Sequence, residues 1–157
     1  MMVRKIKGRL VATGPVMHDG VDNGAEPATI YNYVRLQDEN GGDTYMQQVF
    51  VPAVLDSLLD VGTAGTFYVV EVAIPKLFGS RPFHFVFGLE VGGKLYQAVP
   101  QTRRILNGCK GGAAKLAWYG LILLIAWGFG LLLWVQAARL LSITLPESEM
   151  TAVLAGK

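Results

Sequence analysis

Few residues of this chain could serve as acids, bases or nucleophiles. The sequence holds two histidines, His18 and His84, and one cysteine, Cys109. No HExxH motif and no Cys/His spacing suited to a metal surrounds them. GxSxG and Walker A motifs are absent, and turn formation explains the glycines of DENGGD and VGGK. We therefore expect a protein that is not an enzyme and that carries no metal or cofactor.

Two stripes of residues indicate binding rather than catalysis. The strand expected over Val3–Thr13 has basic residues at alternate positions, and the strand expected over Thr29–Gln37 has two tyrosines and an arginine at alternate positions. If these strands are neighbours, cations and aromatic rings share one outer face, which could bind polyanions or stack sugars. The candidate ligand-binding residues are Lys5, Lys7, Arg9, Tyr31, Tyr33 and Arg35. The alternative is a solvated sheet face with ordinary cross-strand pairs.

The charge of the first hundred residues argues against nucleic acid as the ligand. Residues 1–100 carry ten Asp/Glu and eight Lys/Arg. Proteins that bind nucleic acids usually carry a clear basic excess instead. A small anion, a nucleotide or a saccharide is the ligand class that this face predicts.

A second candidate contact is the loop expected over Pro75–Pro82. Its residues Lys76, Leu77, Phe78 and Arg81 place two apolar side chains between two cations. Such a tip could touch lipid headgroups or enter the pocket of a partner protein. The alternative is that Leu77 and Phe78 fold back and close one end of the β domain.

The longest apolar run of the chain is Leu116–Val135, which contains twenty residues and no charge. As a helix it would be about 30 Å long, the thickness of the hydrocarbon core of a bilayer. Eleven of its residues are Leu, Ile, Val or Phe. The run predicts a transmembrane helix, which we place over residues 116–141.

The charges on either side of this run predict its orientation. Residues 101–115 contain four cations and no acid, Arg103, Arg104, Lys110 and Lys115, whereas only Arg139 closely follows the run. The positive-inside rule places the N-terminus in the cytoplasm and the C-terminus outside. Because the chain is compact and has no low-complexity tails, we expect an integral membrane protein of the bacterial inner membrane. The four cations would contact lipid headgroups at about 1 kcal/mol each.

Small residues in and before the run predict contacts between helices. Close approach of helix backbones in lipid requires small side chains, and a tryptophan in mid-membrane favours a protein neighbour. The candidate packing residues are Ala113, Ala117, Gly120, Ala126, Trp127 and Gly130. The alternative is a solitary anchor. The expected partners are membrane lipid, other transmembrane helices of the same or another chain, and a cytoplasmic protein.

The segment before the run is expected to be mostly strands. Val3–Thr13, Thr29–Gln37 and Thr44–Val51 are followed by a short helix from Pro52 to Gly62, and then by Thr66–Ile74, Phe83–Val91 and Lys94–Val99. In the strand over Phe83–Val91, the alternate apolar residues from Phe83 to Val91 are expected to share one face. This order of elements resembles the topology of an OB-fold barrel. An SH3-like or other small barrel is the competing architecture.

The tail beyond the run predicts a short second helix. Thr144 and Glu147 have the spacing of a capping box, and the helix would continue to about Ala155. Its apolar residues could rest on the membrane or on a partner. A helix this short is not stable alone.

The predicted fold class is therefore mainly β: a small OB-like or SH3-like β-barrel with one short helix, a single transmembrane α-helix and a short C-terminal amphipathic helix. The expected domains are a cytoplasmic β-barrel over 1–100, a basic linker over 101–115, the transmembrane helix over 116–141 and a tail over 142–157. The function predicted from these features is that of an accessory or scaffold subunit in a membrane-embedded protein complex. The alternative is a membrane-anchored ligand sensor whose span oligomerises.

Overall fold

The protein is described by a computed structural model that covers residues 2–17, 27–75, 80–108, 110, 117–119 and 130–156. Its strands are β1 (Met2–Thr13), β2 (Val16–Met17), β3 (Ala28–Gln37), β4 (Asp43–Pro52), β5 (Ala64–Pro75), β6 (Ser80–Val91) and β7 (Lys94–Gln97). The helices are α1 (Ala53–Asp56), α3 (Gly130–Leu141) and α4 (Glu147–Ala155), and residues 99–108 are also helical. The six predicted strands are confirmed within three residues at each end.

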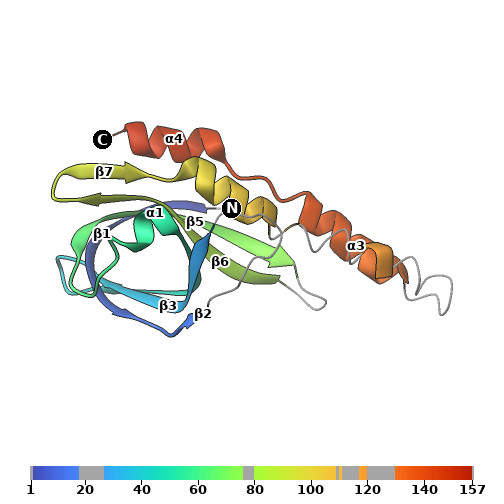
Figure 1. The fold of residues 1–157 in the computed structure, drawn as a ribbon, viewed down its shortest axis with the longest axis horizontal. Helices are drawn as coiled ribbons and strands as arrows, with labels where there is room; N and C mark the ends of the chain where they lie inside the picture. The colour runs from blue at the N-terminus through green and yellow to red at the C-terminus, as the bar shows by residue number, and fades with distance from the viewer. Residues whose placement is uncertain are drawn as a thin grey trace.

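The sheet closes on itself because β1 pairs with two different strands. Its first part, Met2–Arg9, pairs with β5, and its last part, Arg9–Thr13, pairs with β3. From β5 the order continues through β6 and β4 back to β3, while β2 and β7 extend β3 and β6. The pair between β4 and β6 is parallel, and the other described pairs are antiparallel. Figure 1 shows the strands curving around a central space beside α1.

Two glycines allow the strands to approach closely where β1 passes from one partner to the other. Gly8 on β1 lies opposite Gly65 on β5. A Cβ atom on Gly65 would lie 2.2 Å from the carbonyl oxygen of Glu90, and one on Gly8 would lie 2.5 Å from that of Gln37. Both neighbours are backbone atoms, so the clash could not be relieved by a rotating side chain. Glycine is therefore required at both positions.

An inner core fills the space enclosed by the sheet. Leu55, in α1, and Leu59, just after it, lie in this core, so α1 covers one opening of the closed sheet. Its other buried residues come from the strands and from the position just before the helix over 99–108. They are Leu10, Tyr31, Val34, Leu36, Met46, Val49, Val51, Phe67, Val69, Val86, Leu89 and Ala98. Burial of one such side chain contributes about 1.5–3 kcal/mol.

An outer core lies on the opposite face of β5 and β6, beneath helices. Tyr68, Phe85 and Phe87 point to this face and are fully buried. The helix over 99–108 covers them with Ile105 and Leu106, and α4 covers them with Met150 and Leu154. The chain therefore has two apolar layers, one inside the sheet and one between the sheet and its helices (Figure 1).

The C-terminal helix sits on the sheet at a position that only glycine permits. A Cβ atom on Gly88 of β6 would lie 2.9 Å from a methyl carbon of Leu154. Close to Gly88 the pairing of β5 with β6 shifts register, between Tyr68 and Val69. Because of this shift, Phe87 faces the outer core and Leu89 the inner core. The expectation that Phe83–Val91 presents its apolar residues on one face is therefore wrong.

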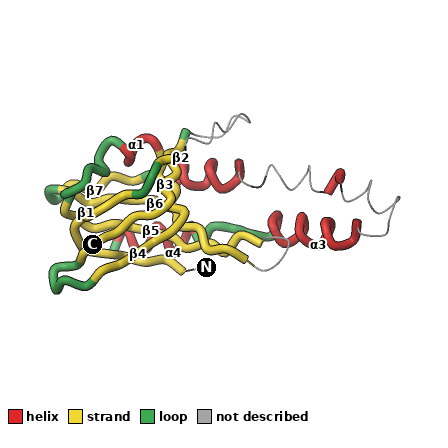
Figure 2. The backbone as a smooth tube through the Cα atoms, turned by 90° about the horizontal axis from the view of Figure 1, so that it is seen from below, coloured by secondary structure: helices red, strands yellow, loops and turns green. Residues whose placement is uncertain are grey.

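The helical segments near the predicted span form a projection from the sheet. Residues 117–119 are helical, and Ala117 packs against the small cluster made by Ala137 and Leu140 of α3 and by Ile74 of β5. Beyond this contact α3 extends away from the sheet (Figures 1 and 2). We call residues 117–119 and α3 together the helical projection.

The predicted fold class is wrong because the part of the chain that the structure describes does not contain the expected transmembrane helix. Among the described residues, no helix has both the length and the apolar character needed to cross a bilayer. The longest labelled helix, α3, has 12 residues and is about 18 Å long, against about 30 Å for a span. The described chain is a mainly β structure with short helices. Residues 109, 111–116 and 120–129 of the predicted linker and span lie outside the described residues.

The position of α4 also overturns the predicted single-pass arrangement. The tail was expected outside the membrane, on the side opposite the β domain, yet Met150 and Leu154 are buried against the sheet. The C-terminus consequently lies beside the strands (Figure 1). The predicted integral-membrane localisation, with the N-terminus inside and the C-terminus outside, is wrong on both grounds. Apolar content alone suggested the span, whereas contacts distant in sequence determine where the tail lies.

The predicted capping box of the tail is not formed. The first helical residue of α4 is Glu147, its N-cap is Pro146, and no side chain caps the helix. Glu147 instead forms an ion pair with Arg103 of the helix over 99–108, with 3.2 Å between Oε1 and Nε. This pair joins the two helices that cover the outer core.

Candidate functional site

The predicted basic stripe lies on β1, mostly opposite β5 rather than β3. Lys5 faces Tyr68 across the pair of strands, with its Nζ 5.6 Å from the ring centre. Lys7 forms an exposed ion pair with Glu39, 2.7 Å between charged atoms, which raises the pKa of Lys7. Arg9 donates a hydrogen bond from Nε to the carbonyl of Gly62 at 3.1 Å. The three cations therefore have neighbours of their own along one strand.

The predicted aromatic stripe is divided between the two sides of the sheet. Tyr31 is 9% exposed and belongs to the inner core, whereas Tyr33 is half-buried and Arg35 is exposed on the outer face. Tyr31 and Val34 both face inward although they are an odd number of residues apart. Opposite this break, Gln48 of β4 has a φ of 51°, which non-glycine residues rarely adopt. The structure thus leaves Tyr33 and Arg35 together and separates them from Tyr31.

Tyr31 has a structural role in holding α1. Its hydroxyl donates a hydrogen bond to Asp56 at 2.7 Å, and Thr29 donates to the other oxygen of the same carboxylate at 2.6 Å. Burial, the hydrogen bond to Asp56 and the charges of Asp56 and Asp60 together raise the pKa of Tyr31 above its ordinary value of 10.0. The phenol is therefore kept neutral in the folded protein.

Replacing Tyr31 by phenylalanine is expected to lower the free energy of unfolding by about 1–2 kcal/mol, because Asp56 loses one of its two donors. Since the pKa of Tyr31 is raised in the folded state, its stabilisation is complete below pH 10 and is lost as the pH rises further. Urea denaturation of both proteins from neutral to alkaline pH measures this. A difference that grows above pH 10 would contradict the assignment.

The other predicted contacts are only partly described. Lys76, Leu77 and Phe78 lie outside the described residues, and Arg81 is exposed on β6. Of the four cations predicted to meet lipid, Arg103 pairs with Glu147, Arg104 is exposed, Lys110 is half-buried, and Lys115 lies outside the described residues. Of the six packing residues, Ala117 contacts the cluster of the helical projection and Gly130 begins α3. Ala113, Gly120, Ala126 and Trp127 are outside the described residues.

The helical projection exposes most of the large apolar side chains found on the surface. Eleven such side chains are exposed among the described residues, and six of them lie on this projection: Trp118, Tyr119, Leu131, Trp134, Val135 and Leu141. On α3, Leu131, Trp134 and Val135 have the spacing of one helical face. They are 67%, 49% and 44% exposed. The opposite face, with Ala137 and Leu140, is buried.

A second surface feature is a polar cavity between β3, β4 and β6. The cavity has a volume of about 200 Å³ and is lined by Asn32, Tyr33, Tyr45, Gln47, Gln48 and Arg81. We call it the tyrosine pocket. The rings of Tyr33 and Tyr45 stack, with centres 5.4 Å apart and planes inclined by 25°. Gln48 donates to Asn32 across the strands at 3.0 Å.

Sequence reasoning identified only part of the tyrosine pocket. Tyr33 was predicted as a ligand residue and Arg81 as part of a contact loop, but Asn32, Tyr45, Gln47 and Gln48 were not singled out. The signal available was the alternation of Tyr45 and Gln47 with buried Met46 along β4. Which strands lie beside this outward face depends on the pairing, and the sequence pattern does not reveal it.

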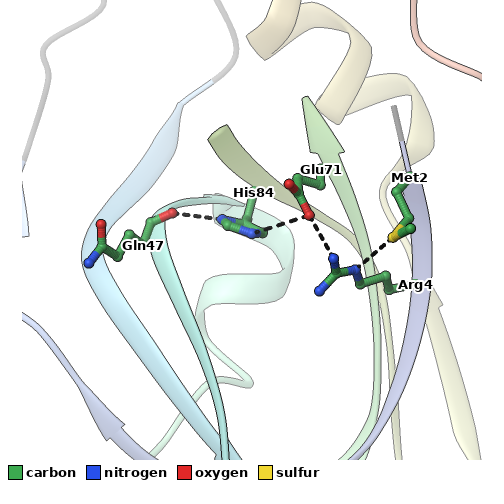
Figure 3. A network of polar contacts seen from close by, with 5 residues as sticks. All are labelled: Met2, Arg4, Gln47, Glu71 and His84. Atoms are coloured by element: carbon green, nitrogen blue, oxygen red, sulfur yellow. Dashed lines mark hydrogen bonds and ion pairs between the residues drawn. The ribbon is translucent and has the colours of Figure 1, made fainter. Parts of the chain in front are cut away.

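A buried histidine supports the strand behind this pocket. His84 of β6 is only 8% exposed. Its Nδ1 lies 2.7 Å from the carbonyl oxygen of Gln47, so this nitrogen carries the hydrogen and donates it. Its Nε2 lies 4.0 Å from Glu71, which in turn forms a 3.0 Å ion pair with Arg4 (Figure 3). These contacts form a chain of polar interactions that crosses the sheet from β4 through β6 and β5 to β1.

A larger cavity of about 370 Å³ lies where the sheet closes, between Lys7, Gln37, Gly65 and Glu90. Its charged groups already have partners, because Lys7 pairs with Glu39 and Glu90 accepts from the hydroxyl of Tyr68 at 3.3 Å. In the part of the chain that the structure describes, no three His, Cys, Asp or Glu residues lie together as a metal site would require. Neither observation identifies a catalytic centre.

Comparisons with protein-family models, with curated proteins and with solved structures find no match. The function is therefore argued from the exposed face of the helical projection and from the tyrosine pocket.

Proposed function

We propose that the protein is a non-enzymatic assembly subunit that docks onto another protein chain through the exposed face of α3. The observation that carries this proposal is the gathering of six exposed large apolar side chains on the helical projection. Exposed apolar patches of this kind are uncommon on proteins that act alone and are typical of interaction surfaces. The role is that of an accessory or scaffold subunit of a protein complex.

The spacing on α3 suggests how the partner is contacted. Leu131, Trp134, Val135 and Leu141 form one uninterrupted apolar stripe, with the small residue Ala138 between them. Leu131, Trp134, Val135 and Ala138 stand at i, i+3, i+4 and i+7, a spacing characteristic of a helix that lies in an apolar groove of its partner, and Leu141 follows at i+10. The stripe contains no charge, so the groove we expect is also apolar. Trp134 is the central anchor, since tryptophan often dominates the energy of an interface.

The closed sheet would act as the rigid base of this docking helix. The inward side of α3 is fixed by Ala137, Leu140 and Ile74 of β5. The helix is therefore held in place before it meets a partner. A preformed helix loses less conformational entropy on binding than a disordered segment does.

Replacing both Leu131 and Trp134 by glutamine is expected to weaken the complex by about 30-fold or more, because a central tryptophan alone contributes about 2 kcal/mol at such interfaces. Native mass spectrometry of the full chain, purified from the cells that express it, measures the fraction bound to protein. Both side chains are exposed, so the substitutions leave the two cores intact.

Val61 provides the matched control. It is 64% exposed, close to the 67% of Leu131, but it lies on a turn of the β domain. The Val61→Gln variant should keep its partner. A wild-type chain that carries no second protein, or a double variant that retains its partner as well as the control does, would contradict the proposal.

A further inference from the structure

We propose that the tyrosine pocket is a binding site for a saccharide, in which one sugar ring stacks on Tyr45 and its hydroxyls bond to the surrounding amides and to Arg81. This site lies on the outer face of β3 and β4, and it is a separate feature from the docking face of α3. The inference does not depend on the proposed assembly role.

Tyr45, the exposed ring of the stacked pair, is held in place through its contact with Tyr33. Tyr33 is held on its inner side by Gly14, where a Cβ atom would lie 2.6 Å from the ring. The backbone N–H of Gly14 also donates to the carbonyl of Tyr33 at 2.8 Å. Tyr45 stacks on the outer side of Tyr33 and is itself 56% exposed. Neither ring belongs to the inner or the outer core, so the pair is a cross-strand contact on the outer surface and leaves one face of Tyr45 open.

The remaining lining is suited to hydroxyl groups. Asn32, Gln47 and Gln48 provide planar amides, each with donors and an acceptor, and Arg81 adds a guanidinium. None of the six lining side chains is a carboxylate. Amides can both donate to and accept from the neighbouring hydroxyls of a sugar, while the aromatic face contacts its C–H side. The volume corresponds to roughly six or seven water molecules at about 30 Å³ each, enough for one ring.

The backbone of β4 has an uncommon conformation at the tyrosine pocket. Gln48 has a φ of 51° within a strand, and its side chain is held by the amide oxygen of Asn32 at 3.0 Å. Its neighbour Gln47 is fixed from behind through the hydrogen bond to buried His84. Uncommon backbone conformations of this kind persist where the surroundings enforce them and often occur at binding sites. The side chains of Asn32 and Gln48 and the backbone of Gln47 are thus held in place before a ligand arrives.

A nucleic acid strand fits this pocket less well. Bases also stack on tyrosines, but single strands require a positively charged groove that follows the phosphates. The nearby cation Arg35 is already paired with Asp43. Residues 1–100 carry two more acidic than basic residues, from the counts of ten and eight. The charges therefore favour a sugar over a polyanion.

Saturation-transfer NMR on the full chain tests the site with glucose, N-acetylglucosamine, glucuronate and AMP as probes. We expect transfer to the ring C–H protons of at least one sugar, with little change between low and high salt because a sugar releases few counterions. Tyr45→Ala should reduce the affinity about tenfold or more, since one aromatic stacking platform contributes that much. Tyr45→Phe should bind as the wild type does, because the ring face and not the hydroxyl makes the contact.

Tyr119 supplies the control, because it is 60% exposed but lies on the helical projection. Tyr119→Ala should leave the sugar signal unchanged. The proposal is overturned if no sugar shows transfer, if AMP alone binds, if binding falls steeply with salt, or if Tyr45→Ala binds as the wild type does.

Discussion

Alanine at position 65 is expected to lower the free energy of unfolding by about 3 kcal/mol, the upper end of the cost of overpacking. The added Cβ would lie 2.2 Å from the carbonyl oxygen of Glu90, so β5 and β6 would have to separate where the sheet closes. Urea denaturation of Gly65→Ala followed by circular dichroism measures the loss. If the strands did not approach closely at Gly65, the same substitution would lower the free energy of unfolding by only a fraction of this amount.

Gly92→Ala is the control that distinguishes a steric clash from the strain of a positive φ. Gly92 has a φ of 58°, and a Cβ atom there would have no neighbour within 4 Å. Its substitution should cost only about 1–2 kcal/mol, the strain of the left-handed conformation. Equal losses for the two variants, or a Gly65→Ala protein as stable as the wild type, would show that the strands do not approach as described.

Met150→Ala is expected to lower the free energy of unfolding by about 2–5 kcal/mol, the range for truncating a fully buried methionine. Met150 is 0% exposed between α4 and the sheet, together with Leu154. Thermal and urea unfolding of the full chain measure the effect. The prediction tests whether the tail returns to the β domain, which is where the single-pass interpretation of the sequence failed.

Glu149→Ala is the matched control for this prediction. Glu149 is exposed on the same helix, so its replacement should change the free energy of unfolding by less than about 0.5 kcal/mol. If Met150→Ala is as neutral as Glu149→Ala, α4 is not part of the outer core.

The positions of the strands could be predicted because their signals are local. Alternating residues in β1, the Asn-Gly and Gly-Gly turn before β4, and the β-branched run of β5 each specify an element within about ten residues. The two cores depend on distant contacts instead. The register shift beside Gly88 and the positive φ of Gln48 change which side chains face inward, and neither leaves a periodic signal.

The apolar run shows how composition can mislead. Twenty uncharged residues satisfy the requirement for a span, yet the described part of the run belongs to the short helical segments of the helical projection. The tail packs on the β domain, because Glu147 forms an ion pair with Arg103 and Met150 is buried against the sheet. Arg103, one of the four cations that predicted the orientation of the span, thus forms a tertiary contact with α4.

The candidate sites could be predicted only in fragments. The stripes singled out Tyr33 and Arg35, but Tyr31 turned inward and the cations of β1 found other neighbours. Tyr45 and Gln48 become recognisable only when β3 and β4 are paired in register. The exposed face of α3 is likewise defined by the opposite face that packs on β5.

The central claim is that α3 docks onto another protein chain. Photo-cross-linking tests it most directly, with a photoreactive residue placed at position 131 or 134 of the full chain and at position 61 as the control. In cells that express the protein, we predict a discrete protein adduct from each α3 position and none from position 61. The claim is contradicted if the α3 positions give no protein adduct, give only lipid adducts, or give the same products as position 61.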